Sequence, residues 1–129
     1  MSHAHHPSTV AELKPAEVQA LLQNQQILLI DVREPVEYSA ERIHGALLYP
    51  LSTFDPAFLP GDEPRRVVFH CAGGVRSLNA AQKRLAKGMS AAHMAGGLAA
   101  WKAAGLPTVK VDPATGQIID AGLATKHAR

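Results

Sequence analysis

The 129-residue sequence has a single cysteine, a formal net charge of only +2 and no long apolar run. One cysteine cannot form a disulfide within the chain, so nothing in the sequence calls for an oxidising compartment. The small net charge gives no overall attraction to nucleic acid, and any electrostatic role must therefore be local. Every apolar run is far shorter than the roughly 18 residues that a membrane-spanning helix needs, and the first residues lack the apolar segment of a secretion signal. We therefore expect a soluble, cytoplasmic protein that binds neither nucleic acid nor a membrane.

The pattern of apolar residues indicates the fold class. An apolar fraction of 47% and a charged fraction of 19% are typical of a globular protein, and the length suits one domain. Runs without polar alternation, such as 27–30 and 67–69, are typical of strands covered on both faces of a parallel sheet. Segments with an apolar stripe at helical spacing, such as 15–22 and 76–85, alternate with these runs. The alternation predicts an α/β fold in which helices cover both faces of a parallel sheet.

The expected strands are 9–13, 27–30, 47–49, 67–69 and 91–94, followed by an extended segment at 106–111. The expected helices begin at Pro15, span 37–42, begin near Arg76 and open after Gly96, with a helical turn within 54–59.

The ends of the chain show no clear period. We expect a disordered N-terminal tail at 1–8, the folded domain at 9–111 and a C-terminal extension at 112–129. The tail carries His3, His5 and His6, but no carboxylate or cysteine stands near them in the sequence to complete a metal site. We therefore expect no metal.

The most informative stretch surrounds Cys71, which follows the apolar run 67–69. Four residues, two of them glycines, separate it from Arg76, where a helix is expected to begin. Glycine permits the unusual dihedral angles of a loop that turns its N–H groups inward, and a helix N-terminus favours negative charge. These features predict a lowered pKa for the Cys71 thiol and a nucleophilic thiolate beside an anion-binding loop. The alternative is a buried, unreactive cysteine before an ordinary turn.

A second candidate region lies at the end of the run 27–30, where open α/β sheets place their ligand crevices. Asp31 and Arg33 occupy this position, just before a helix start at Pro35. The sequence allows two interpretations, a place beside the site or an ordinary ion pair that fixes the loop.

Several segments occur in an order that resembles the rhodanese domain family, over about 10–109. They are Leu29-Ile30-Asp31-Val32-Arg33-Glu34-Pro35 with Glu37-Tyr38, Ile43-His44-Gly45-Ala46, Cys71-Ala72-Gly73-Gly74-Val75-Arg76-Ser77, Gly96-Gly97-Leu98 with Trp101, and Gly105-Leu106-Pro107. The resemblance implies a five-stranded parallel sheet with helices on both faces, in three α/β/α layers. Glu41-Arg42-Ile43 departs from the family, which commonly has Gly-His-Ile there.

The resemblance also implies roles for individual residues. Cys71 matches the nucleophile that accepts sulfane sulfur as a persulfide, and Asp31 and Arg33 match residues that support the site. The residues that match the substrate-binding loop are Ala72, Gly73, Gly74, Val75, Arg76 and Ser77.

The implied reaction is a two-step transfer from a small anionic donor such as thiosulfate to cyanide or a thiol. Because the sequence has no second cysteine, the acceptor thiol must belong to another molecule, either small or a protein. No metal or organic cofactor is implied.

Two other classes of function stay open. A non-enzymatic persulfide carrier, redox sensor or partner-binding module would also retain Cys71. A cysteine phosphatase usually places five residues between its cysteine and arginine, whereas four separate Cys71 from Arg76 here. The shorter loop counts against the phosphatase.

Overall fold

The structure is a computed structural model that describes residues 9–121. The expected tail at 1–8 and the last part of the expected extension, 122–129, lie outside the described residues.

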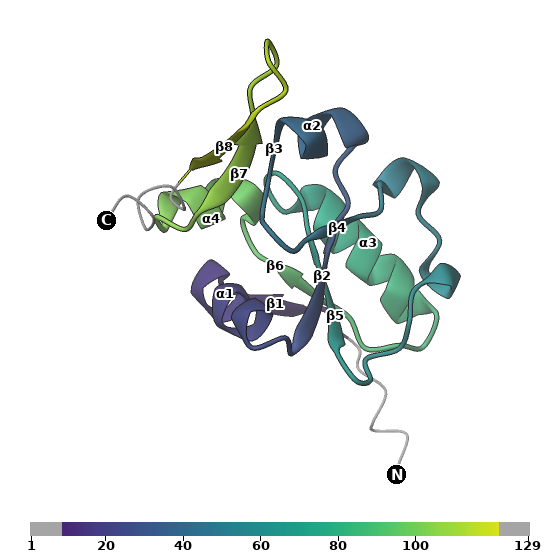
Figure 1. Ribbon diagram of the computed structural model, residues 1–129. Helices are drawn as coiled ribbons and strands as arrows, with labels where there is room; N and C mark the ends of the chain where they lie inside the picture. Colours follow the sequence, from purple (N-terminus) through teal and green to yellow (C-terminus); the bar gives the residue numbers. More distant parts are fainter. Residues whose placement is uncertain (1–8, 122–129) are drawn as a thin grey trace.

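The centre of the fold is a five-stranded, entirely parallel sheet with strand order β1-β6-β5-β2-β4 (Figure 1). Its strands are β1 (Ala11–Leu13), β2 (Ile27–Asp31), β4 (Leu47–Leu48), β5 (Arg66–His70) and β6 (Ala92–Met94). The predicted fold class is confirmed. The carboxyl ends of β2 and β5 lie side by side, because Asp31 pairs with His70 in register.

Helices cover both faces of this sheet. They are α1 (Pro15–Gln23), α2 (Pro35–Ala40), α3 (Val75–Ala86) and α4 (Gly97–Ala103). Leu29 of β2 packs in one core with Trp101 of α4, whereas its neighbour Ile30 packs in the other core with Ala81 of α3. In Figure 1 the strands accordingly lie between α1 and α3. Both faces of β2 are buried, which explains why its sequence shows no polar alternation.

Between β4 and β5 the chain forms two short 3-10 turns, η2 (Leu51–Thr53) and η3 (Pro56–Phe58). The second lies within the helical turn predicted at 54–59.

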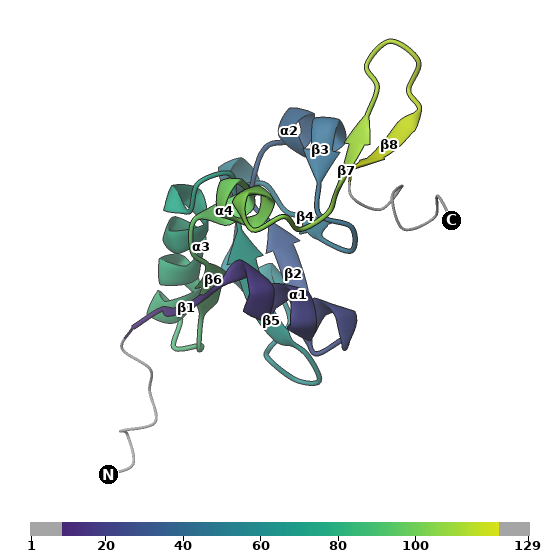
Figure 2. The same ribbon diagram turned by 90° about the vertical axis from the view of Figure 1, so that its left-hand side faces the viewer.

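A second, antiparallel sheet has strand order β3-β7-β8. Its strands are β3 (Glu41–Arg42), β7 (Thr108–Val111) and β8 (Ile118–Ala121). The prediction of a helix over 37–42 is wrong at its end, since α2 stops at Ala40 and the next two residues are extended. These two residues pair with β7, a strand that is distant in the sequence, and this tertiary pairing overrides local helical preference. The turn between β7 and β8 projects away from the body of the molecule (Figure 2).

The start of α4 packs directly on the backbone that follows β5. The N–H of Leu98 donates to the carbonyl oxygen of Cys71 at 2.8 Å, and that of Ala99 donates to Ala72 at 3.0 Å. Gly97 permits this approach, with a φ of +60° and no side chain; a Cβ there would overlap the Cys71 carbonyl oxygen and lie 2.7 Å from that of Ala72. The glycine therefore lets α4 hold the Cys71 loop by its carbonyl groups.

Gly97→Ala should lower the free energy of unfolding by about 2–4 kcal/mol, because it combines overpacking against backbone with a strained left-handed residue. Gly105→Ala is the matched control, since Gly105 also has a positive φ of +78° but has no neighbour within 4 Å of the added Cβ. We expect a loss of about 1 kcal/mol in the control. Urea unfolding of both variants tests this, and equal losses would contradict the role assigned to the close packing.

Candidate active site

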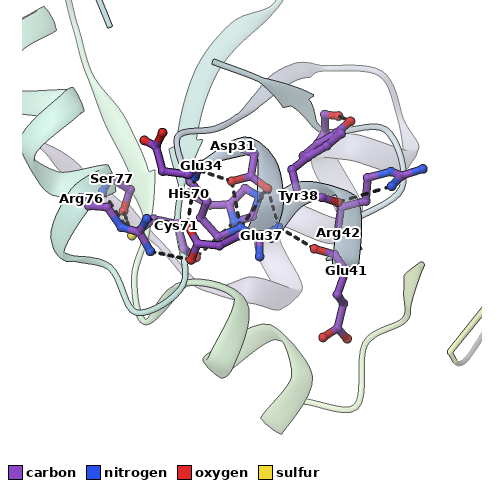
Figure 3. A network of polar contacts seen from close by, with 12 residues as sticks. Asp31, Glu34, Glu37, Tyr38, Glu41, Arg42, His70, Cys71, Arg76 and Ser77 are labelled. Carbon is purple, nitrogen blue, oxygen red and sulfur yellow. Dashed lines mark hydrogen bonds and ion pairs between the residues drawn. The ribbon is translucent and has the colours of Figure 1, made fainter. Parts of the chain in front are cut away.

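The sulfur of Cys71 lies at the start of α3, where the loop after β5 turns its backbone inward. Gly74 caps α3 with a left-handed φ of +106°, as the glycine-rich sequence predicted. The N–H groups of Gly74 and Ser77 donate to Sγ at 3.1 and 3.2 Å. Ser77 Oγ lies 3.5 Å from the same sulfur, and Figure 3 shows Ser77 beside Cys71. Cys71 is only 1% exposed. The loop thus surrounds one atom with several hydrogen-bond donors.

These donors change the acidity of the thiol. Burial raises the pKa of Cys71, but hydrogen bonds from the Ser77 hydroxyl and from the N–H groups of Ser77, Gly74 and Gly73 outweigh it. The pKa of the Cys71 thiol is therefore lowered from its ordinary value. The arrangement favours a thiolate, which is the reactive form of a cysteine.

Arg76 does not extend freely into solvent. Its guanidinium donates to both carboxylate oxygens of Glu37 in α2, at 2.7 and 3.0 Å (Figure 3). The hydrogen bonds from Arg76 lower the pKa of Glu37 to about 2. Glu37 is absent from the residues predicted for the site. Its place near the start of a helix gave no sign of a partner 39 positions away.

Asp31 and Arg33 form a buried ion pair, with Arg33 Nη2 2.8 Å from Asp31 Oδ2. Arg33 Nη2 also donates to the carbonyl oxygen of Glu41 at 2.6 Å, which fixes the start of β3. On the other side His70 Nε2 lies 3.4 Å from Asp31 Oδ2, outside hydrogen-bond geometry. His70 directly precedes Cys71 and pairs with Asp31 in the register of β2 and β5. Among the described residues, the hydrogen bonds of Asp31 and Arg33 join them to each other and to Glu41, and none reaches the Cys71 sulfur. Their role as supporting residues therefore stays a prediction.

His93 was expected only as part of a strand, but it reaches the site from β6. Its Nδ1 lies 2.7 Å from Ser77 Oγ, the atom that lies 3.5 Å from the Cys71 sulfur. A pattern of local residues could not have found this contact, because β6 and α3 meet only when the sheet is assembled.

The family model described as the rhodanese-like domain matches residues 14–104.

The chain belongs to the rhodanese-like domain family.

A sulfurtransferase from Allochromatium vinosum is 32% identical over 92 residues, covering 70% of this chain and 86% of that protein. An uncharacterized protein from Synechocystis is 43% identical over 103 residues, covering 79% of this chain. The chain spans only 58% of the length of that relative. Among solved structures, a rhodanese-related protein from Thermoplasma volcanium superimposes with a TM-score of 0.67 at 25% identity, over 77% of this chain and 97% of that one.

Two features, a membrane-spanning helix and a metal-binding cluster, are absent from residues 9–121. Within this range no helix combines the length and the apolar character needed to cross a membrane. The same residues contain no cluster of three or more His, Cys, Asp or Glu side chains that could hold a metal ion.

Asp31→Asn should destabilise the rhodanese-like domain strongly. The change leaves Arg33 buried without its counter-charge, and breaking a buried pair in this way costs about 3–5 kcal/mol. Lys102→Ala is the control, because it removes an exposed ion pair with Glu41 and should cost about 1 kcal/mol or less.

The loss should depend on pH in a defined direction. Burial raises the pKa of Asp31, but the neighbouring His70 and Arg33 outweigh it and hold the pKa well below its ordinary value. The carboxylate thus stabilises the fold above a pH of about 4, and this contribution declines as the pH falls further. Urea unfolding at several pH values should show wild type and Asp31→Asn converging below that pH, and a constant difference would contradict the assignment.

Proposed function

We propose that this rhodanese-like domain is a sulfurtransferase that carries sulfane sulfur as a persulfide on Cys71. The observation that carries the proposal is the pair of backbone N–H groups, from Gly74 and Ser77, directed at Sγ. They stabilise negative charge on the thiolate, and the same loop offers donors for the charge of a persulfide. The similarity to a sulfurtransferase over most of that relative's length supports the same class of reaction.

In the first half-reaction, the Cys71 thiolate attacks the outer sulfur of thiosulfate. A new S–S bond forms at Sγ, and the bond between the two sulfur atoms of the donor breaks. Sulfite leaves with the bonding electron pair, and Cys71–S–S⁻ remains in the loop. No proton is consumed when the attacking group is already the thiolate.

In the second half-reaction, an acceptor attacks the terminal sulfur of the persulfide and Cys71 leaves as the thiolate. Cyanide gives thiocyanate, and a thiol gives its own persulfide with release of a proton. Cys71 is the only cysteine in the chain, so a thiol acceptor is a separate small molecule or protein.

The remaining loop residues bind the donor in this proposal. Ala72, Gly73 and Val75 complete the backbone around the sulfur, and the Arg76 guanidinium attracts the oxyanion of the donor. Arg76 is paired with Glu37, however, so the donor meets a cation whose charge is already offset. Because the pKa of Glu37 is about 2, this carboxylate stays charged at every pH used in ordinary assays. We therefore propose that the backbone N–H groups contribute most of the donor affinity and Arg76 a smaller part.

Cys71→Ser should fold normally yet lose thiosulfate:cyanide transfer, because an alcohol cannot become the persulfide. Wild type incubated with thiosulfate should gain the mass of one sulfur atom, which cyanide then removes, whereas the variant should gain nothing. Intact-mass spectrometry measures both. Persistent loading without turnover would favour a persulfide carrier or sensor. Near wild-type turnover in Cys71→Ser, or faster hydrolysis of an aryl phosphate than consumption of thiosulfate, would contradict the proposed class.

Variants of the ion pair separate the contribution of Arg76 from that of Glu37. Arg76→Ala should weaken the affinity for thiosulfate by about 1.5 kcal/mol or less, below the usual worth of a charged hydrogen bond, and Arg76→Lys by less again. Glu37→Gln should strengthen the affinity about two- to fivefold, because it releases the guanidinium while its amide oxygen still accepts the N–H of Glu34. Glu63→Gln, which removes an exposed carboxylate before β5, is the control.

The measurement is the concentration of thiosulfate that half-saturates persulfide formation in single-turnover experiments. Unchanged affinity in all the Arg76 and Glu37 variants would limit Arg76 to a structural role at the start of α3.

A further inference from the structure

His93 connects the site to the edge of the sheet next to β1. His93 is 3% exposed, and its two ring nitrogens contact different side chains. Nδ1 lies 2.7 Å from Ser77 Oγ, which lies 3.5 Å from Cys71 Sγ. The Ser77 hydroxyl contacts the nucleophilic sulfur, and a buried histidine this close to the hydroxyl is placed to exchange a proton with it.

The outer nitrogen of His93 faces a carboxylate. Nε2 lies 3.5 Å from Oε2 of Glu12 in β1, a residue paired with His93 in the parallel register. The Glu12 side chain is 62% exposed, so this end of the arrangement meets solvent. The four side chains form a continuous line from the buried sulfur to the surface.

Other charged groups do not replace His93 in this line. His70, the other buried histidine beside the loop, contacts the carbonyl oxygen of Cys71 and faces Asp31. Around His93, β1 contributes Glu12, the loop directly after β5 contributes Cys71, and α3 contributes Ser77. Next to Ser77 is Arg76, whose guanidinium is paired with Glu37. His93 is therefore the titratable base in contact with the Ser77 hydroxyl.

We propose that His93 takes the proton of the Cys71 thiol through Ser77 and holds it, facing Glu12, while Cys71 reacts. The S–H bond breaks and its proton forms a new O–H bond at Ser77 Oγ, while the original hydroxyl proton moves to Nδ1 of neutral His93. The electron pair of the S–H bond stays on sulfur, so the products are a thiolate and an imidazolium. The inference rests on the proposed function, and it assigns His93 as a positioning residue that acts through Ser77.

The imidazolium form also orients the hydroxyl. Once Nδ1 carries a proton, it donates to Ser77 Oγ, and the hydroxyl in turn donates to the thiolate. The sulfur then receives the Ser77 hydroxyl in addition to the N–H groups of Gly74 and Ser77. At the other end of the imidazole, Nε2 lies 3.5 Å from the Glu12 carboxylate.

His93→Asn tests the proposal, because the amide lies near the position of Nδ1 and can hydrogen-bond to Ser77 but cannot hold the proton. The measurement is the rate of Cys71 alkylation by iodoacetamide as a function of pH. We expect the variant to react about tenfold more slowly than wild type near pH 7, which corresponds to one unit in the thiol pKa. The two rates should converge near pH 10, where the thiol ionises unaided. Thermal unfolding confirms that the variant is folded.

A purely structural role for His93 gives a different result. If His93→Asn reacts as fast as wild type near pH 7, or more slowly by the same factor at every pH, the proposal is overturned. Glu12→Gln should slow alkylation about two- to threefold near pH 7, since it weakens the outer contact only. Equal rates for Glu12→Gln and the control Glu63→Gln would overturn the part assigned to Glu12.

The alkylation experiment needs no sulfur donor, and it therefore separates this inference from the proposed function. If wild type gains no sulfur from thiosulfate, the sulfurtransferase proposal fails while the alkylation profile still tests His93. If wild type gains sulfur but the His93→Asn profile is unchanged, the proton path fails alone.

Discussion

The convergence of backbone N–H groups on one buried sulfur is the constraint on which the rest of the site depends. Backbone donors can point inward only if their carbonyl groups find partners elsewhere, since an unpaired buried carbonyl is costly. The first turn of α4 meets this need for Cys71 and Ala72. The parallel sheet brings β5 and α3 together so that the loop closes at a helix N-terminus, where negative charge is favoured. The site is thus largely made of backbone, and side chains adjust it.

Charge around the site is balanced in pairs. Arg76 is matched by Glu37, and Arg33 by Asp31, so the guanidinium groups nearest the loop create little net field at a distance. This agrees with the net charge of +2, which indicated that any electrostatic effect would be local. The acidity of Cys71 accordingly depends on short-range donors, which ionic strength screens only weakly.

Features within one segment could be predicted from the sequence. The apolar runs of β2 and β5 predicted the parallel sheet. The glycines between Cys71 and Arg76 predicted the loop and the start of the helix after it. The contacts that the sequence did not reveal join distant segments. Glu37 meets Arg76 through the packing of α2 on the loop, and Glu12 meets His93 only because β1 pairs with β6. The error at Glu41 has the same origin, since its extended conformation is set by pairing with β7.

The attachment of α4 to the carbonyl groups of the loop has a thermodynamic consequence. The hydrogen bonds from Leu98 and Ala99 form when the chain folds. The loop therefore loses its conformational entropy during folding and does not lose it when a substrate binds. A donor would meet a receptor that is already shaped, and its association would need little loss of protein entropy. Local opening of α4 would remove these hydrogen bonds and with them the preformed shape of the loop.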